Sequence, residues 1–271
     1  MPQYLKWFKR LDKILTSADG KAIEIWEFNY QLDNTVLSDW ATHFRNQYCD
    51  DKYIDEYRDG DQFGKTREEY LLNRIFPDKT ENFGPATRSG DFGELLIADL
   101  LEYLEDYWVP RTRYDNKTTR NSSTQGSDVL AIKLASDKDF SPKDELLVTE
   151  VKAQFSGKEA EDRLQDAVDD SNKDPTRKGE SLNAIKRRYI NEGNEKLADI
   201  IKRFQNPLDN KYLEEYAAAA LFSDSVYDEG RIILTDCQDH TERDNLRLII
   251  IHGKNMMQLV HSLYERAAHE A

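Results

Sequence analysis

Two short apolar runs constrain the fold of this chain most strongly. The first covers residues 128–132 and the second covers residues 146–151, with a turn that contains Pro142 between them. Because short apolar runs bounded by turn signals are typical of buried strands, they predict two neighbouring strands. In a hairpin-like pairing, the start of the first strand lies beside the end of the second. We therefore expect residues 128 and 150 to meet at one end of a sheet.

The remaining segments predict further strands and a set of helices. Apolar residues recur at helical spacing in several segments, and two other short runs have the character of strands. A polar loop is expected over residues 115–126. Helices are expected over residues 38–57, 67–75, 91–106, 159–170, 180–205, 211–222 and 254–269, and extended segments over residues 22–28, 108–114, 231–234 and 246–251. This order predicts a mixed α/β fold, in which helices flank a sheet.

The chain of 271 residues is long enough for one large domain or two modest ones. Gly84 and Pro85 form a turn signal and suggest a boundary. We expect an N-terminal α+β segment over residues 1–84, with a role in partner docking, and a main domain over residues 85–271.

The charge balance limits the partners of the chain. Asp and Glu number 52 against 38 Lys and Arg, which gives a net charge of −14. A free-standing DNA-binding protein is usually basic, so nucleic-acid contact here would need local basic patches, a divalent metal or a partner protein.

Several other classes of protein are excluded. The longest uninterrupted apolar run, residues 216–222, is too short to span a bilayer, and the start of the chain lacks the apolar stretch of a signal peptide. The two cysteines, Cys49 and Cys237, cannot form a disulfide framework or a four-cysteine zinc site. We expect a cytoplasmic protein, in a bacterial cell, that does not associate with a membrane.

Charged side chains at the end of the second apolar strand are the first candidates for chemistry. Glu150 and Lys152 are two residues apart, so they project from the same face of that strand. Asp128 would lie beside them. Carboxylate oxygens suit Mg²⁺, with Mn²⁺ as a possible substitute, and Mg²⁺ takes substrate phosphate as a further ligand. Lys152 would orient or deprotonate a metal-bound water, or stabilise charge that develops on a phosphodiester.

Two more groups are candidate metal ligands. Glu94, on the helix expected over residues 91–106, could supply a further carboxylate, and the backbone carbonyl of Val151 lies between Glu150 and Lys152. Glu94 has an alternative role, because it follows Asp91 by three residues, which is the spacing of a capping box if Asp91 opens the helix. The alternative for Glu150 and Lys152 is an ordinary ion pair at a solvated strand end.

Several basic and polar residues are candidate DNA contacts. Phosphate contacts from Lys and Arg give affinity without sequence specificity. Gln154 projects on the same face as Lys152 and is a further candidate, with an ordinary strand-end polar group as its alternative. For the basic residues the alternative is solvated surface charge. They are Arg111, Arg113, Lys117 and Arg120 in one loop, and Lys186, Arg187 and Arg188 on a helix.

This pattern resembles the PD-(D/E)xK nuclease superfamily. Asp128 precedes the Glu150, Val151 and Lys152 triplet at the family's spacing, and Glu94 lies on a preceding helix. The proline of the name is absent, since Ser127 precedes Asp128. The resemblance implies a restriction-endonuclease-like mixed sheet flanked by helices, and a Mg²⁺-dependent deoxyribonuclease. It also implies that Glu94, Asp128, Glu150 and Lys152 surround one or two Mg²⁺ ions.

A narrower resemblance is to HamA, the nuclease subunit of Hachiman anti-phage defence systems. It is carried by residues 88–96, 109–113, 125–129 and 149–152. The resemblance implies a partner, the superfamily 2 helicase-type ATPase HamB, and a nuclease that is restrained until the helicase engages DNA. Two alternatives stay open: a stand-alone restriction-type endonuclease, and a non-catalytic subunit that holds DNA or a partner on a nuclease-like scaffold.

Overall fold

A single mixed sheet forms the centre of the protein. The computed structural model describes residues 1–115, 117–122, 125–136 and 139–271. Seven strands among these residues follow the order β1–β3–β7–β6–β5–β4, with β2 beside β3. The neighbours β3, β7, β6 and β5 are parallel, whereas β4 pairs with β5 and β1 pairs with β3 in the antiparallel sense. The strands are β1 (Phe8–Arg10), β2 (Leu15–Thr16), β3 (Ala22–Phe28), β4 (Val129–Lys133), β5 (Glu145–Gln154), β6 (Leu213–Ser223) and β7 (Leu246–Gly253).

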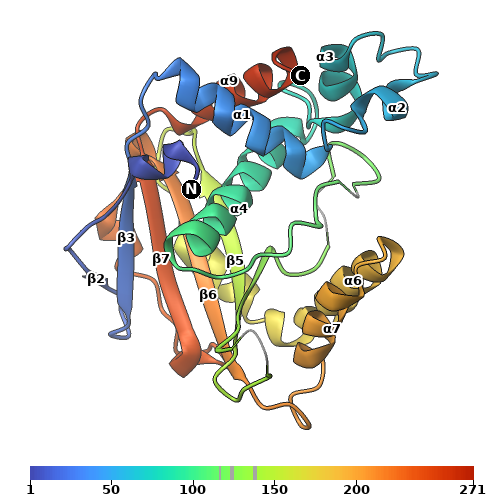
Figure 1. Cartoon of the computed structure of the whole chain (residues 1–271). Coiled ribbons are helices and arrows are strands. Elements are labelled where there is room, and N and C mark those ends of the chain that lie inside the picture. Colours follow the sequence, from blue (N-terminus) through green and yellow to red (C-terminus); the bar gives the residue numbers. More distant parts are fainter. Residues whose placement is uncertain (116, 123–124, 137–138) are drawn as a thin grey trace.

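Helices cover both faces of this sheet (Figure 1). On one face lie α1 (Asn34–Tyr48), α4 (Gly84–Leu104) and α9 (Met256–His269), and on the other lie α5 (Arg163–Ser171), α6 (Asp174–Asn191) and α7 (Glu195–Phe204). Each face of the sheet packs an apolar core against its helices. Along β5, Leu147 and Val151 belong to the core under α1, α4 and α9, while Leu146 and Val148 belong to the core under α5, α6 and α7. The expected α/β fold, a mixed sheet flanked by helices, is therefore confirmed.

Shorter helical pieces complete the connections. They are α2 (Ile54–Arg58), α3 (Arg67–Tyr70), α8 (Glu229–Ile232), a π-helical turn (Leu71–Ile75) and the 3₁₀ turns Gln3–Trp7, Asp224–Val226 and Arg243–Asn245. Within the described ranges, no helix has both the length and the apolar character that crossing a membrane requires.

The N-terminal segment shares the sheet and the apolar core of the rest of the chain. Its strand β3 pairs in parallel with β7, and its helix α1 packs against α9. Trp40 of α1 contacts Phe92 of α4 through their rings. The suggested boundary at residue 84 coincides with the start of α4.

Two sequence-based assignments of secondary structure are wrong. Residues 211–222 were expected to form a helix, but they form most of β6, although alanine favours helices. This strand lies between β5 and β7 and is buried on both faces, so tertiary packing overrides the local preference. Residues 231–234 were expected as a strand, but α8 covers their first half. The Asp228 carboxylate accepts hydrogen bonds from the backbone N–H groups of Gly230 and Arg231, which caps α8.

Several boundaries also differ from the expectation. The helix expected over residues 180–205 is divided into α6 and α7, with Gly193 at a positive φ of 72° between them. Of the extended segment expected over residues 108–114, Trp108 forms an isolated bridge with Ile132, and residues 109–115 continue as irregular chain. In the polar loop expected over residues 115–126, residues 116, 123 and 124 lie outside the described part of the chain.

Candidate active site

The β4–β5 hairpin brings Asp128 and the end of β5 together. The last paired residues of the ladder are Val129 and Thr149. One step further, the Val151 N–H donates a hydrogen bond of 2.9 Å to Asp128 Oδ2. The Asp128 carboxylate therefore accepts the hydrogen bond that a backbone carbonyl of β4 would accept if the ladder continued. This bond holds Asp128 beside the Glu150–Lys152 pair. In a strand ladder, the N–H and C=O of one residue point to the same neighbouring strand, so the Val151 carbonyl faces the same side as Asp128.

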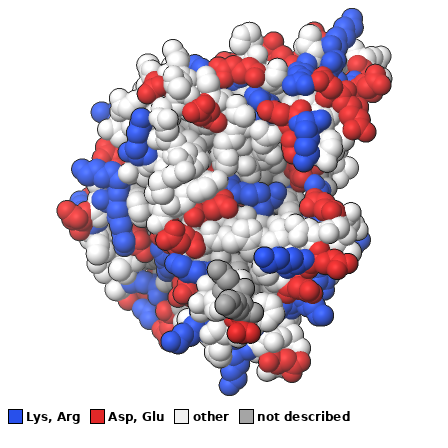
Figure 2. All heavy atoms as spheres, in the orientation of Figure 1, with Lys and Arg blue, Asp and Glu red and all other residues white. Residues whose placement is uncertain are grey.

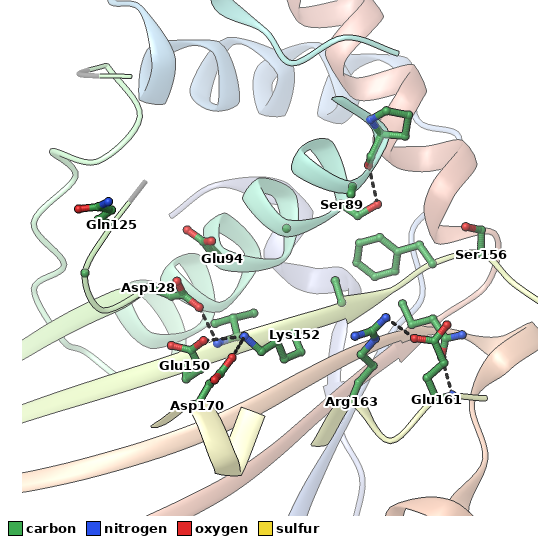
Figure 3. A pocket seen from close by; sticks show the side chains of 18 of the residues that line it. Ser89, Glu94, Gln125, Asp128, Glu150, Lys152, Ser156, Glu161, Arg163 and Asp170 are labelled. Atoms are coloured by element: carbon green, nitrogen blue, oxygen red, sulfur yellow. Dashed lines mark hydrogen bonds and ion pairs between the residues drawn. The ribbon is translucent and has the colours of Figure 1, made fainter. Parts of the chain in front are cut away.

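A cavity of about 880 Å³ opens over this end of the sheet (Figure 3). The four residues expected to be catalytic all line it, and they come from different elements. Glu94 lies on α4, Asp128 directly precedes β4, and Glu150 and Lys152 lie on β5. Gln154 also lines the cavity, but its side-chain amide bonds to the backbone of Glu159 and Glu161.

Lys152 pairs with two carboxylates. Its Nζ lies 2.7 Å from Glu150 Oε1 and 2.6 Å from Asp170 Oδ2 of α5. Burial lowers the pKa of Lys152, but these two ion pairs raise it more, so the net pKa is above its ordinary value. Asp170 responds in the opposite sense: burial raises its pKa, and the bonds from Lys152 and Lys173 bring it down to about 2. Lys152 is thus protonated at neutral pH, which suits charge stabilisation better than removal of a proton.

Glu150 is held in a state that favours protonation. Burial and then the charge of Asp128 raise its pKa to about 7. Its second oxygen, Oε2, is buried and accepts no hydrogen bond among the described residues; Arg177 of α6 lies 3.7 Å away. Asp174 of α6 behaves similarly, since burial raises its pKa to about 6 although Ser127 Oγ donates to it at 2.9 Å.

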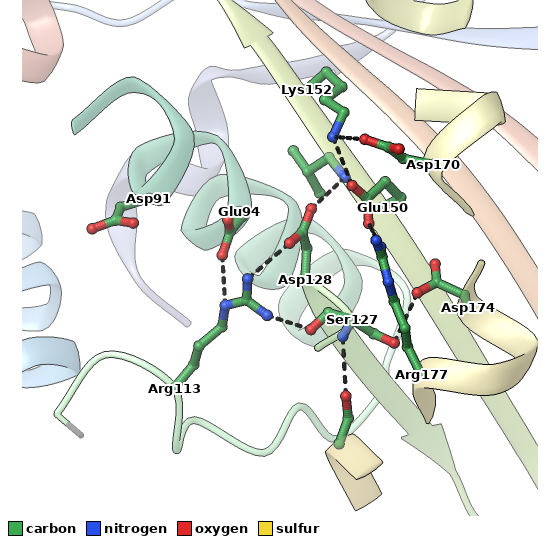
Figure 4. Close-up of polar contacts among 12 residues, drawn as sticks. Asp91, Glu94, Arg113, Ser127, Asp128, Glu150, Lys152, Asp170, Asp174 and Arg177 are labelled. Carbon is green, nitrogen blue, oxygen red and sulfur yellow. Dashed lines mark hydrogen bonds and ion pairs between the residues drawn. The ribbon is translucent and has the colours of Figure 1, made fainter. Parts of the chain in front are cut away.

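Glu94 and Asp128 share an arginine (Figure 4). Arg113 Nε lies 3.0 Å from Glu94 Oε2, and Arg113 Nη2 lies 2.8 Å from Asp128 Oδ1. Tyr114 also donates its hydroxyl proton to Glu94. Burial raises the pKa of Glu94 to about 8, although Arg113 opposes that shift.

The capping-box interpretation of Glu94 is wrong. Helix α4 begins at Gly84 with Pro85 in its first turn, a position that proline favours because its missing N–H has no helical partner there. Asp91 therefore lies inside the helix. Its carboxylate accepts a hydrogen bond of 2.8 Å from the Tyr48 hydroxyl and pairs with Lys117. Glu94 is left to point toward the cavity side of α4 (Figure 3).

Most of the expected DNA-binding cations are engaged elsewhere. Arg113 pairs inside the site. Of all seven basic candidates, none belongs to the described lining of the cavity. The contacts of the others are Arg111 with Asp99 and Glu102, Lys117 with Asp91, Arg120 with Asp78, Arg188 with Asp115 and Glu192, and Lys186 with Gln205, while Arg187 is exposed on α6.

Other cations line the cavity instead. They are Lys152, Arg163 of α5 and Arg177 of α6. Sequence reasoning missed the two arginines and the carboxylates Asp170 and Asp174, because no spacing rule connects them with β5. On the face shown in Figure 2, positive and negative side chains intermingle over the surface.

The carboxylates of this cavity are side chains of the kind that bind a hard divalent cation. Among the residues that the structure describes, no three His, Cys, Asp or Glu side chains lie close enough together to hold a metal ion. Glu94 stands on the α4 side of the sheet and Glu150 on the α5 side, with Asp128 at the strand end between them (Figure 4). The buried Glu150 Oε2, which lacks a hydrogen bond, is the group that a cation would satisfy.

The fold and this cluster define a mixed α/β protein with an acidic, lysine-containing cavity at the end of a strand pair. The model of the HamA family matches residues 2–267, which is nearly the whole chain. The chain belongs to the HamA family, and this confirms the narrower resemblance drawn from the sequence motifs. The family places the chain among components of Hachiman anti-phage defence. No curated protein matches it.

Proposed function

We propose that this chain is a metal-dependent DNA nuclease of the PD-(D/E)xK type, which acts as the effector subunit with a helicase-type ATPase in anti-phage defence. One observation carries the proposal: Asp128, Glu150 and Lys152 meet at the end of β5 in a cavity that Glu94 also lines. This set of side chains and its order along the chain resemble those of the nuclease superfamily, which supports the proposal.

Asp128, Glu150 and the Val151 carbonyl would hold Mg²⁺ or Mn²⁺, and Glu94 would complete the set. When bound, the ion supplies a more acidic water and neutralises charge that develops on the phosphodiester. Protonated Lys152 adds a fixed positive charge beside the same phosphate. The Asp170 carboxylate holds the Lys152 ammonium in place at 2.6 Å.

Phosphates of the DNA would meet Arg163 and Arg177. Both line the cavity, and their side chains are about one-third exposed, so each head group reaches solvent. Contacts of this kind bind DNA without reading its sequence. The net charge of −14 opposes free DNA, which supports a partner that delivers it.

Residues 1–84 are the proposed docking segment for that partner. This segment carries four large aromatic side chains that are exposed on the protein. Exposed aromatic residues are enriched at protein interfaces. They are Tyr53, Tyr57, Phe63 and Phe83.

A second candidate function is a non-catalytic subunit that binds DNA or a partner. The observation that favours it is the pairing of Arg113 with both Glu94 and Asp128, together with the lack of a preformed three-ligand cluster among the described residues. A stand-alone restriction-type endonuclease is the third candidate, and the acidic charge counts against it.

The test is a cleavage assay on the purified full-length chain. Supercoiled and linear DNA are incubated with Mg²⁺, with and without the helicase-type partner and ATP. Glu150→Ala removes a proposed ligand, and Glu145→Ala, at the other end of β5, is the matched control. Cleavage that needs the partner and is lost only in Glu150→Ala supports the proposal. Cleavage without the partner indicates a stand-alone enzyme, and equal cleavage by Glu150→Ala contradicts the site.

A further inference from the structure

We infer that Arg113 is an internal cation that occupies the proposed metal ligands Glu94 and Asp128, and that a divalent cation binds only when this arginine leaves them. The inference rests on the proposed function, because it concerns the metal site of the same cavity. It assigns to Arg113 an inhibitory role that differs from the DNA contact expected of it from sequence.

The guanidinium group of Arg113 contacts three acceptors at once. Nε lies 3.0 Å from Glu94 Oε2, Nη2 lies 2.8 Å from Asp128 Oδ1, and Nη1 donates to the Ser127 carbonyl. The side chain is only 15% exposed. A planar guanidinium in this position bridges two carboxyl groups from different elements (Figure 4), which is also what a divalent cation would do there.

These contacts occupy carboxylate oxygens that a metal would need. Asp128 uses Oδ1 for Arg113 and Oδ2 for the Val151 N–H. Glu94 Oε2 accepts a hydrogen bond from the Tyr114 hydroxyl and lies 3.0 Å from Arg113 Nε in an ion pair. Glu150 differs from these two residues, because its buried Oε2 accepts no hydrogen bond in the described part of the chain. This explains why Glu94, Asp128 and Glu150 form no metal-binding cluster in the described chain although all three line the same cavity.

The backbone around Arg113 allows the side chain to be released. Residues 109–115 run between α4 and β4 without helix or strand, so no ladder of hydrogen bonds must break when this segment moves. The ion pairs of Arg113 and the burial of Val109 and Tyr114 restrain this segment. Because Arg113 and a divalent cation compete for the same two carboxylates, each weakens the binding of the other.

Arg111 provides a matched control on the same segment. It also pairs with two carboxylates, Asp99 at 2.8 Å and Glu102, and its side chain is 18% exposed. It does not line the large cavity. Loss of Arg111 therefore removes a similar buried double ion pair without touching the proposed ligands.

The test measures Mg²⁺ binding by calorimetry to the full-length chain, without DNA. We expect Arg113→Gln to bind Mg²⁺ about tenfold more tightly than wild type or more, where tenfold corresponds to about 1.4 kcal/mol. Arg111→Gln is expected to bind as wild type does. Binding by Arg113→Gln alone also supports the inference.

Two results overturn it, and they are distinguishable. If wild type binds Mg²⁺ and Arg113→Gln binds it equally or more weakly, Arg113 positions the carboxylates and does not block them; the proposed nuclease then stands. If no variant binds Mg²⁺, both the inference and the metal-dependent function fail.

A second measurement on wild type does not depend on how a variant folds. The Nε–H signal of Arg113, assigned through bonds by NMR, reports the contact with Glu94. We expect this signal to move or broaden as Mg²⁺ saturates the protein. An unchanged signal at saturation would mean that metal and Arg113 occupy the site together, and the inference would be wrong.

Discussion

Replacement of Glu150 by glutamine is expected to stabilise the metal-free protein at alkaline pH. The ordinary pKa of this carboxyl is 4.5, and burial together with Asp128 raises it to about 7 in the folded protein. The folded state therefore keeps a proton that the unfolded state releases. As pH rises from the unfolded pKa to the folded one, the folded state loses stability, and the loss is complete above the folded pKa.

The magnitude follows from that shift. A rise of about 2.5 pKa units corresponds to about 3 kcal/mol at 25 °C. Glutamine cannot ionise, and its carbonyl oxygen still accepts a bond from Lys152, although less strongly than a carboxylate. We therefore expect Glu150→Gln to be about 1–3 kcal/mol more stable than wild type at about pH 8, and about equal near pH 4.5.

The assay is urea unfolding followed by circular dichroism, in chelator and at several pH values between those limits. Glu145→Gln, at the other end of β5, controls for the loss of a strand carboxylate. The reasoning is refuted if Glu150→Gln is less stable than wild type at about pH 8, because the ion pair with Lys152 would then outweigh the burial of the charge.

Three other predictions address the chemistry and the fold. Lys152→Met is expected to lower the cleavage rate about a hundredfold or more while Mg²⁺ affinity, measured by calorimetry, is retained; a rate within a few-fold of wild type would remove Lys152 from the mechanism. Chelation of divalent metal should abolish cleavage, and added Mg²⁺ should restore it; activity that persists in chelator would contradict metal dependence. Gly84→Ala should destabilise the protein by about 1–3 kcal/mol, because a Cβ there would lie 2.4 Å from the Asp78 backbone oxygen. Gly90 lies in the same helix, and a Cβ there would have nothing within 4 Å, so Gly90→Ala should be neutral or slightly stabilising. Thermal unfolding of both variants checks this, and an equal loss of stability in the two would refute the steric argument.

The hairpin that carries the candidate site was predictable from sequence for a physical reason. Two buried strands that follow each other in the sequence leave few pairings, and the observed register places Val129 opposite Thr149. Asp128 is the next residue beyond that pair, and its carboxylate accepts a hydrogen bond from the Val151 N–H. The late strand β7 and the amphipathic helix α9 were also confirmed, since their apolar patterns are unambiguous.

Long-range packing was not predictable from one sequence. The alanines in β6 carry a helical preference, and only the position of β6 between two parallel strands explains their extended conformation. Asp170 and Asp174 lie beside β5 because α5 and α6 cross that face of the sheet, which no local spacing encodes. Arg113 was expected to contact DNA, but its bonds to Glu94 and Asp128 depend on the path of an irregular segment.

The most direct test of the account is the initial rate of DNA cleavage by the chain with its helicase-type partner, Mg²⁺ and ATP, compared with the rate of Asp128→Asn. Asp128 is the residue that joins the two halves of the site, through Arg113 on one oxygen and Val151 on the other. We predict a fall of about a thousandfold in rate, with the circular dichroism spectrum unchanged. Cleavage by Asp128→Asn at the wild-type rate would contradict the assignment of this cavity as the active site.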